Sequence, residues 1–415
     1  MRYILILFLL FTFTIQANTI DVCATCDVKT IKNAVLLAKD GDTILVKKGV
    51  YKESQININR AIHIIGIDYP VIDAENKTES IFAIEADNFI ISGLKFVNVG
   101  MSHTKEIAAI FISHSNNFTI KDNIAENVFY GFILQRVKYG LIQNNKVHGR
   151  ADAKNETTAG NGVHIWKSIH VRIEQNELVG MRDGIYLEFV DKSSISNNTS
   201  KDNIRYGLHF MFSHHNEYQR NEFRNNGAGV AVMFSKFIKM HHNTFHYNWG
   251  TASYGLLLKE INDAEIYNNI FEQNTIGINV DGCNRINYKE NHFIRNGWAI
   301  KFTGGCYTNI FEFNNFMYNA FDLSYNSRLN DNKFEANYWS EYSGYDLDKD
   351  GIGDVPHRPV KLFSYIVNKT PETLVLLRSL FVDIINFSEK VSPVFTPDNL
   401  QDNKPIMRPM NPLTE

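Results

Sequence analysis

The sequence predicts an all-β fold: a single-stranded right-handed parallel β-helix (a solenoid) with an N-terminal helical cap and with a C-terminal helix and extended tail. The first supporting observation is a series of glycines that open short strand-like segments, 22, 26 and 22 residues apart: Gly207, Gly229, Gly255 and Gly277. After each glycine, apolar residues alternate with variable ones, which is the two-residue period of a strand. One short strand recurring at such a spacing is the pattern of a repeat architecture.

The second observation is a triplet of asparagine, any residue and an apolar residue, which recurs with a similar period. Its asparagines are 31, 45, 22, 26, 22, 23 and 18 residues apart: Asn145, Asn176, Asn221, Asn243, Asn269, Asn291, Asn314 and Asn332. The gap of 45 contains a weaker copy at Asn198. Asparagine tolerates the left-handed backbone of tight corners, and its side chain can hydrogen-bond to its equivalent on the next layer. A propeller is the structural alternative, but its blades need about 40 residues with four antiparallel strands.

Length, charge and the N-terminus limit the function. The chain has 415 residues, 44% of them hydrophobic, and a formal net charge of -3, so we expect a large core and no nucleic-acid partner. Residues 1–17 are predicted to be a signal peptide, with Arg2 before an apolar run and Ala17 at the cleavage site. The apolar run is too short to span a bilayer. We therefore expect an exported, periplasmic protein; an uncleaved anchor is the alternative.

The four cysteines are interpreted in that oxidising setting. Cys283 and Cys306 are 23 residues apart, which is one coil of the repeat. Residues one coil apart have Cα atoms about 5 Å from each other, within the range of a disulfide. We therefore expect a Cys283–Cys306 disulfide between neighbouring coils. Cys23 and Cys26 could form a strained disulfide, a soft-metal site or an N-terminal staple, and these alternatives stay open.

The expected domains follow one another along the chain. After the signal peptide come an N-terminal cap at 18–54, a parallel β-helix of about a dozen coils at 55–340 and an Asp/Gly-rich cap at 341–370. Residues 371–415 are expected to form an apolar helix, over 373–387, and a tail that binds a partner. This helix is too short and too charged to span a membrane. The Pro-rich tail is expected to order only on its partner.

Outward positions of the stacked strands place metal ligands in columns. The second and fourth residues after each glycine point outward, so His164, Tyr186 and His209 share one column, and Met211 and Met233 share the next. Imidazole and thioether together suit copper in its reduced state. The candidate copper ligands are His209, Met211, Met233, His164, His214 and His215. Simple packing of the same side chains is the alternative.

A second candidate metal site lies after the last coil. Aspartates alternate there, and Gly351 takes the sixth place of a calcium-loop pattern: Asp346, Asp348, Asp350 and Asp354. The twelfth place is His357, where a calcium loop of the EF-hand type has glutamate, and two long flanking helices are not predicted. We therefore expect a turn-rich cap, with or without calcium.

An enzyme is the main functional alternative. Tyr186, Glu188 and His209 are predicted to form a compact trio, which would fit a secreted polysaccharide lyase or epimerase. Glu188 and Asp281 share a column but are four coils apart, about 19 Å, which is too far for a glycosidase pair. Exposed aromatic residues such as Trp166 could instead bind sugars, so a carbohydrate-binding β-helix is a further alternative.

The chain also resembles the NosD family, the periplasmic β-helix proteins of nitrous oxide reductase maturation. The resemblance covers the mature chain, and three segments carry it: 49–53, 64–73 and 337–359. It implies an accessory, non-catalytic role in assembly of the copper–sulfide centre of nitrous oxide reductase. The implied partners are that reductase, an ABC-transporter permease and its ATPase, with a copper chaperone as a further candidate. The helix at 372–388 would meet the permease and associate the protein with the membrane. The family supplies no fixed copper-ligand motif.

Overall fold

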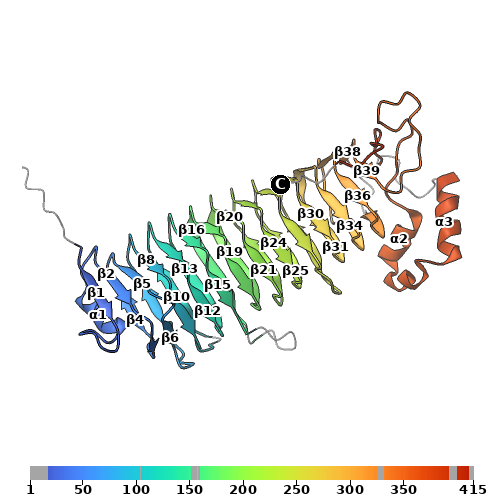
Figure 1. Ribbon diagram of the computed structural model, residues 1–415. Helices are drawn as coiled ribbons and strands as arrows, with labels where there is room; N and C mark the ends of the chain where they lie inside the picture. Colours follow the sequence, from blue (N-terminus) through green and yellow to red (C-terminus); the bar gives the residue numbers. More distant parts are fainter. Residues whose placement is uncertain are drawn as a thin grey trace, which may run out of the picture.

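The computed structural model describes residues 17–102, 104–150, 157, 159–324, 331–391 and 400–410. The predicted signal peptide therefore lies outside the described residues, except for Ala17. The predicted right-handed parallel β-helix is confirmed. In the described part of the chain, three parallel sheets of 14, 12 and 13 strands run along the molecule (Figure 1). In general a strand pairs with the third strand before and after it, because each coil adds one strand to each sheet.

The strands are assigned to sheets A, B and C. Sheet A contains β1 (Thr19–Val22), β2 (Thr43–Val46), β5 (His63–Gly66), β8 (Ile90–Ser92), β11 (Thr119–Lys121), β14 (Leu141–Gln143), β17 (Arg172–Glu174), β20 (Ser194–Ser196), β23 (Glu217–Gln219), β26 (Lys239–His241), β29 (Asn262–Tyr267), β32 (Asn284–Lys289), β35 (Ile310–Glu312) and β38 (Lys333–Glu335). Sheet B contains β3 (Val50–Tyr51), β6 (Val71–Asp73), β9 (Lys95–Val97), β12 (Ile124–Glu126), β15 (Lys146–His148), β18 (Glu177–Val179), β21 (Thr199–Lys201), β24 (Glu222–Arg224), β27 (Thr244–His246), β30 (Ile270–Glu272), β33 (His292–Ile294), β36 (Asn315–Met317) and β39 (Tyr338–Trp339). Sheet C contains β4 (Ile56–Ile58), β7 (Phe82–Ile84), β10 (Ala108–Ser113), β13 (Tyr130–Gln135), β16 (Val163–Ile169), β19 (Asp183–Asp191), β22 (Tyr206–Met211), β25 (Ala228–Met233), β28 (Tyr254–Lys259), β31 (Ile276–Asp281), β34 (Trp298–Thr303) and β37 (Phe321–Ser324).

The glycines that revealed the repeat mark a place where successive coils nearly touch. A Cβ atom added to Gly229 would lie 2.4 Å from the carbonyl oxygen of Gly255 on the next coil. The position is therefore glycine in most coils, and alanine, the smallest other residue, takes it at Ala299 in β34. The following residues alternate as expected: Leu208 and Phe210 are fully buried in the core, while Met211 is only partly buried and faces outward.

A buried ladder of asparagines joins the coils. From Asn123 to Asn337, each side-chain amide donates to the side-chain oxygen of the next asparagine at 2.9–3.0 Å. The members are Asn123, Asn145, Asn176, Asn198, Asn221, Asn243, Asn269, Asn291, Asn314 and Asn337. Asn198 is thus a full member. Asn332 belongs to another column, where it accepts a hydrogen bond from Asn309 at 2.9 Å.

One prediction about these asparagines is wrong. The ladder residues do not take the left-handed conformation; the residue before each of them does. That position holds Asn144 and Asn197, but also Arg220 and His242, with φ between 52° and 56°. For residues other than glycine and asparagine, this conformation costs roughly 1–2 kcal/mol of free energy. The ladder amides point inward, where their hydrogen bonds help to hold each corner.

The ladder ends on a carboxylate from the C-terminal segment. Oδ2 of the fully buried Asp402 accepts from the backbone N–H and the Nδ2 of Asn337 at 2.9 and 3.0 Å, and from Nε1 of Trp339 at 3.1 Å. Leu400 is also fully buried, and Lys404 pairs with Glu335 at 2.9 Å. The expectation that the tail orders only on a partner is therefore wrong for residues 400–410, which pack on the chain's own last coils.

A second asparagine ladder ends in the same way. It runs from Asn203 to Asn319, and Nδ2 of Asn319 donates to Oδ1 of the buried Asp322 at 3.2 Å: Asn203, Asn226, Asn248, Asn274, Asn296 and Asn319. Burial raises the pKa of Asp322 to about 6, although the hydrogen bond from Asn319 opposes that shift. Each of these two ladders therefore ends on an aspartate, an acceptor that needs no further partner along the axis.

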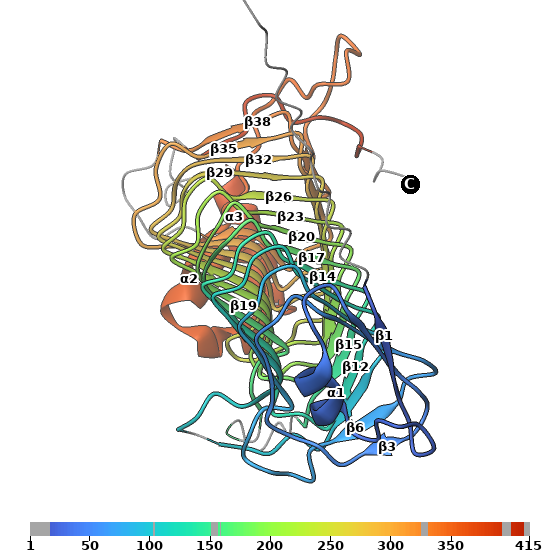
Figure 2. The same cartoon turned by 90° about the vertical axis from the view of Figure 1, so that its left-hand side faces the viewer.

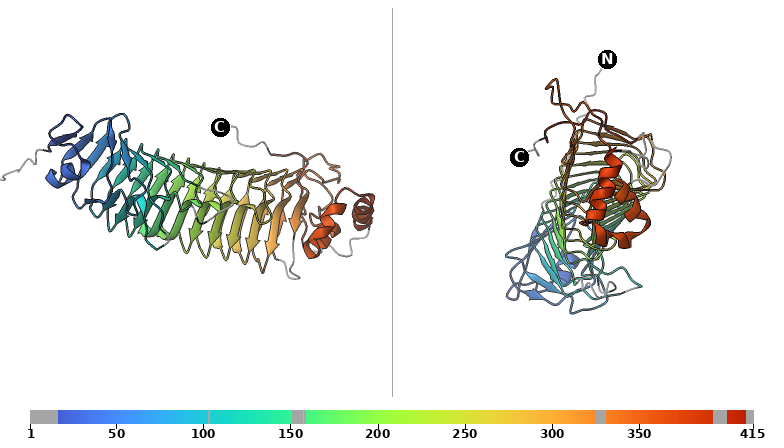
Figure 3. Two further views of the ribbon diagram at one scale, coloured as in Figure 1. Left: turned by 90° about the horizontal axis from the view of Figure 1, so that it is seen from below. Right: turned by 90° about the vertical axis from the view of Figure 1, so that its right-hand side faces the viewer.

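Helices cover both ends of the solenoid. Helix α1 (Ile31–Leu37) lies across the N-terminal end (Figure 2), where Thr30 accepts a hydrogen bond from the N–H of Asn33 at 3.2 Å. Helix α2 (Leu362–Lys369) lies at the other end (Figure 3). Its Phe363 packs on Phe321 of β37. Among the described residues, no helix is both long and apolar enough to cross a membrane.

The predicted helix over 373–387 is wrong in its extent. The segment forms a 3₁₀ helix, η2 (Pro371–Leu376), and, after a turn, helix α3 (Leu380–Val391). The turn lets Val382 of α3 fold back against Phe363 and Val367 of α2, so tertiary packing overrides the continuous helical pattern.

The predicted Cys283–Cys306 disulfide is also wrong, since both cysteines are free and buried. The two residues do lie on neighbouring coils, as expected. However, both thiols point the same way: the sulfur of Cys306 accepts from the N–H of Cys283 at 3.5 Å, and that of Cys283 accepts from the N–H of Ile261 at 3.4 Å. Ser235 makes the same contact with the N–H of Ser213 at 3.1 Å. Cysteine thus replaces serine in a column of side chains that accept hydrogen bonds from backbone N–H groups of the preceding coil. The disulfide forms between Cys23 and Cys26 instead.

The Asp402 contacts predict how the C-terminal coils respond to a mutation. Asp402→Ala removes the acceptor of three buried N–H groups, each of which then costs about 1–3 kcal/mol. We expect faster amide hydrogen exchange in residues 311–339, measured by mass spectrometry, and unchanged exchange in the first coils. Asn403→Ala, at an exposed neighbouring position, should leave both regions unchanged. Equal protection of 311–339 in the two variants would contradict the role given to Asp402.

Candidate functional site

The outer face of sheet C carries the predicted copper ligands, and its register places them in columns. His164 pairs with Tyr186, Tyr186 with His209, and Met211 with Met233. His209 and Met211 are on one strand, two residues apart, so both face outward. Neighbouring members of a column are therefore about 4.8 Å apart at the backbone. The arrangement puts one imidazole and two thioethers on a single patch, which we call the His/Met patch: His209, Met211 and Met233.

The ring of His209 is buried and unpaired. The residue is only 5% exposed, and neither ring nitrogen has a hydrogen-bond partner. Nδ1 lies 3.7 Å from Oδ2 of Asp183, beyond normal hydrogen-bond distance. A buried imidazole nitrogen without a partner is costly for stability, and its lone pair stays available to a ligand.

Asp183 and Arg205 form an ion pair beneath this patch. Nε and Nη2 of Arg205 donate to the two carboxylate oxygens at 2.8 and 2.5 Å. Burial alone would raise the pKa of Asp183, but the hydrogen bonds and charge of Arg205 outweigh burial and hold that pKa below its usual range. The sequence analysis missed this pair. The sequence does contain a pattern that predicts the pair, because Asp183 and Arg205 have opposite charges and are 22 residues, or one coil, apart.

The structure separates His164 from the other donors. The ring of Tyr186 lies between the two histidines, 4.7 Å from His164 and 4.9 Å from His209, measured between ring centroids. The two imidazoles therefore cannot bind one ion in this arrangement. Burial lowers the pKa of His164 to about 4, so the ring is neutral at neutral pH. Its Nδ1 is buried and has no hydrogen-bond partner.

The two methionines remain adjacent and reachable. Met211 and Met233 are paired across β22 and β25, and both side chains are partly exposed. The hydroxyl of Tyr186 donates to the sulfur of Met211 at 3.7 Å, which leaves the second lone pair of that sulfur available. Because methionine has three rotatable bonds, both sulfurs can turn toward one ion.

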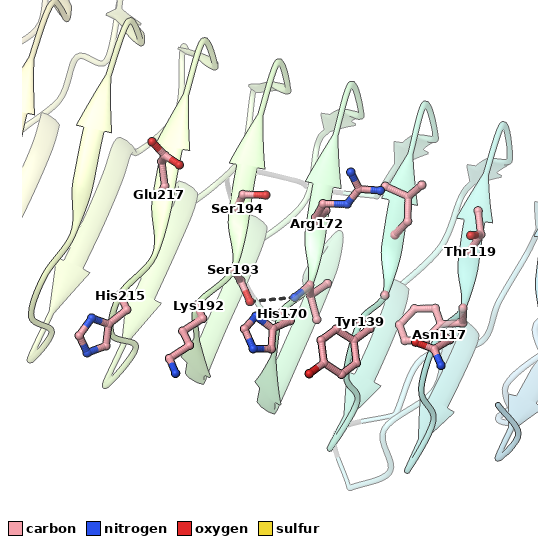
Figure 4. A pocket seen from close by; sticks show the side chains of 14 residues that line it. Asn117, Thr119, Tyr139, His170, Arg172, Lys192, Ser193, Ser194, His215 and Glu217 are labelled. Atoms are coloured by element: carbon pink, nitrogen blue, oxygen red, sulfur yellow. Dashed lines mark hydrogen bonds between the residues drawn. The ribbon is translucent and has the colours of Figure 1, made fainter. Parts of the chain in front are cut away.

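His214 and His215 lie elsewhere, in the turn after β22. Nδ1 of His214 accepts from the N–H of Lys236 at 3.2 Å, so this histidine supports the coil above it. His215 stacks on Phe237, with ring centroids 4.8 Å apart. It lines a groove of about 700 Å³ beside sheet A, where Figure 4 shows it in a row with Lys192, His170 and Tyr139. Neither residue joins the His/Met patch.

The enzyme alternative depends on Tyr186 as the group that moves a proton. Burial, and next the charge of Glu188, raise the pKa of Tyr186 to about 12. A tyrosine base would need a lowered pKa to work near neutrality. The predicted trio is therefore brought together, with His209 beside Tyr186, and the raised pKa of Tyr186 does not favour this tyrosine as the base.

The aspartate-rich loop gathers three of its four predicted ligands. Asp346, Asp348 and Asp350 have carboxylate oxygens within 4.8 Å of one another, the one such group of three His, Cys, Asp or Glu residues among the described residues. Asp354 instead accepts from the N–H of Leu347 at 2.7 Å. Gly351, with φ of 88°, permits the sharp turn. The cluster could hold a hard cation such as calcium.

The chain is a parallel β-helix protein with a histidine and two methionines together on one sheet face. Residues 148–344 match the family model described as "NosD: Periplasmic copper-binding protein (NosD)". A Pseudomonas aeruginosa protein named "Probable ABC transporter binding protein NosD" is 25% identical over 380 residues, which cover 79% of this chain and 80% of that protein. The chain is therefore similar to NosD proteins, over residues 148–344 by the family model and over most of its length by the Pseudomonas aeruginosa relative.

Further similarities are partial or concern the fold. A Stutzerimonas stutzeri protein with the same name is 28% identical over 146 residues, 34% of this chain and 30% of that protein. Among solved structures, the A-module of the Azotobacter vinelandii mannuronan C-5 epimerase AlgE4 has a TM-score of 0.54 at 13% identity and covers 73% of this chain and 88% of its own. The Dettilon tailspike protein has a TM-score of 0.55 at 13% identity and covers 71% of this chain and 66% of its own. At such identities the structures share the fold alone.

A calcium site in the aspartate loop predicts a stabilising effect of the ion. Adding Ca²⁺ should raise the thermal midpoint of the wild-type chain, because the ion binds the folded loop and not the unfolded chain. Asp348→Ala should remove this shift, measured by differential scanning calorimetry. Lys349→Asn keeps a residue suited to the left-handed backbone at that position and should retain it. If Asp348→Ala changes the midpoint equally with Ca²⁺ and with chelator, the loop is structural only.

Proposed function

We propose that this chain is a periplasmic accessory protein that receives Cu(I) on its β-helix and passes it on during maturation of nitrous oxide reductase, together with an ABC transporter. The His/Met patch carries the proposal: His209, Met211 and Met233. Thioether and imidazole are soft donors that suit Cu(I). An accessory protein must release its ion, and a patch with few donors and two partly exposed methionines favours exchange over permanent retention. The family description as a periplasmic copper-binding protein supports this function.

Replacing the two sulfurs tests the copper proposal. Met211→Leu/Met233→Leu keeps side chains of similar volume and removes both thioethers. We expect it to lose one equivalent of bound Cu(I) in anaerobic competition with a chromophoric Cu(I) chelator. Met101→Leu is the control, because Met101 is exposed and lies outside sheet C.

The same variants can be tested for their effect on the copper content of nitrous oxide reductase. In cells that make the double variant, nitrous oxide reductase should contain less copper, whereas the Met101→Leu strain should yield normally loaded enzyme. Wild-type Cu(I) binding together with normal copper content would remove the His/Met patch from the proposal.

Helix α3 supplies the proposed surface for the ABC permease. One face of α3 packs on α2 through the buried Val382. The other exposes a stripe of large apolar side chains, between 55% and 74% exposed: Leu380, Phe381, Ile384, Phe387 and Val391. Exposed apolar stripes of this kind mark interaction sites. The helix stands at the end of the solenoid, where Figure 3 shows it free of the coils on one side. The relatives' name, ABC transporter binding protein, supports the choice of partner.

Two phenylalanines on this stripe give the corresponding test. Phe381→Ala/Phe387→Ala removes large apolar area from the proposed interface, and truncation of such anchors commonly costs 2 kcal/mol or more, at least about thirtyfold in affinity. We expect the ABC complex to be lost when the chain is purified from detergent-solubilised membranes. Leu347→Ala, which is 77% exposed in the aspartate loop, should purify with the complex as the wild type does. Equal recovery of the complex in all three would exclude α3 as the docking surface.

A further inference from the structure

Two adjacent imidazoles face each other at the corner that follows β26. Nδ1 of His241 lies 2.9 Å from Nδ1 of His242. One nitrogen must donate and the other accept, so the pair shares a single proton. His242 has the left-handed backbone conformation, with φ of 56°, which turns its side chain back toward His241. This corner is separate from the His/Met patch, because it lies beside sheet A.

The remaining contacts of His241 orient its ring. Nε2 of His241 lies 3.0 Å from Oε1 of Glu217, whose position on β23 is labelled in Figure 4. The ring also stacks flat on Tyr267, with centroids 4.7 Å apart and planes at 7°. Because the carboxylate accepts the Nε2 proton, the Nδ1 of His241 keeps its lone pair. Metal-binding histidines typically donate their other N–H to a carboxylate in this way.

The number and charge of the donors indicate which ion fits. Within the described part of the chain, no group of three His, Cys, Asp or Glu ligand atoms within 4.8 Å includes these histidines. Zinc in proteins is almost always held by more donors, in tetrahedral geometry. Cu(I) accepts two nitrogens in a linear arrangement. Both donors are neutral ring nitrogens, and imidazole is a ligand that suits copper.

We infer that His241 and His242 form a two-coordinate Cu(I) site, with the ion between their Nδ1 atoms. The ion takes the place of the shared proton, and His242 carries that proton on Nε2 instead. No proton is released and no redox step occurs. Two metal–nitrogen bonds of about 2 Å require the Nδ1 atoms to separate by about 1 Å from their present distance. The partly exposed His242 side chain can make this movement.

This inference goes beyond the proposed function and does not depend on it. The His/Met patch and the His241–His242 pair are on different faces, so each can be tested while the other is intact. A chain with both sites would accept Cu(I) at two separate places on the solenoid. The two double variants would then each remove a different equivalent of Cu(I).

The test is anaerobic Cu(I) titration of the full chain against a chromophoric Cu(I) chelator. His241→Ala/His242→Ala should lose one equivalent that Met211→Leu/Met233→Leu retains. His242→Asn is a milder variant, because Asn268 on the next coil and Asn197 two coils before hold the same left-handed position, and it should lose the same equivalent. Glu217→Gln should weaken this equivalent about 10–100-fold without removing it, since Glu217 only positions His241. X-ray absorption at the copper edge of Met211→Leu/Met233→Leu should show two nitrogen neighbours.

His246→Ala is the matched control. Nε2 of His246 lies 2.8 Å from Oε1 of Glu222, so it is also a carboxylate-bound histidine, but no second imidazole faces it. It should bind Cu(I) as the wild type does. Unchanged stoichiometry and affinity in His242→Asn, or copper with three or more protein ligands in the absorption spectrum, would overturn the two-histidine site.

Discussion

The asparagine ladders are the constraint on which the rest of the structure depends. Each amide accepts from the coil before it and donates to the coil after it, so every coil is held in one register. A shift by one residue would turn the whole outward set of side chains into the core. Because the hydrogen bonds run in one direction, each of the two long ladders needs a pure acceptor at its C-terminal end. Asp402 and Asp322 meet that need with carboxylates.

This fixed register also explains the chemistry of the outer surface. Residues that are far apart in sequence become neighbours in straight columns, so a donor on one coil is matched only by what the next coil presents. Met211 meets Met233, whereas His164 meets Tyr186. In the part of the chain that the structure describes, the outcome is several small groups of histidine and methionine side chains on different faces.

Much of the fold could be predicted because glycine spacing and apolar alternation report directly on stacking and burial. The columns followed from the same frame. Other features depended on information that spacing lacks. Cys283 and Cys306 were placed correctly one coil apart, but the direction of their thiols follows from the N–H groups they accept. His214 and His215 were near the patch in sequence, yet a corner turns them onto another face. The return of Asp402 to the last coil left no repeat signal in the sequence.

The closed ladder ends have an architectural consequence. Since the terminal acceptors are supplied by Asp402 and Asp322, the interior coils act as interchangeable spacers, and a whole coil could be gained or lost without disturbing either cap. Four coils separate β25, which carries Met233, from β37, on which α2 and then α3 rest. At about 4.8 Å per coil, the solenoid sets a reach of about 19 Å along its axis. This distance can therefore change only by whole coils, about 4.8 Å at a time.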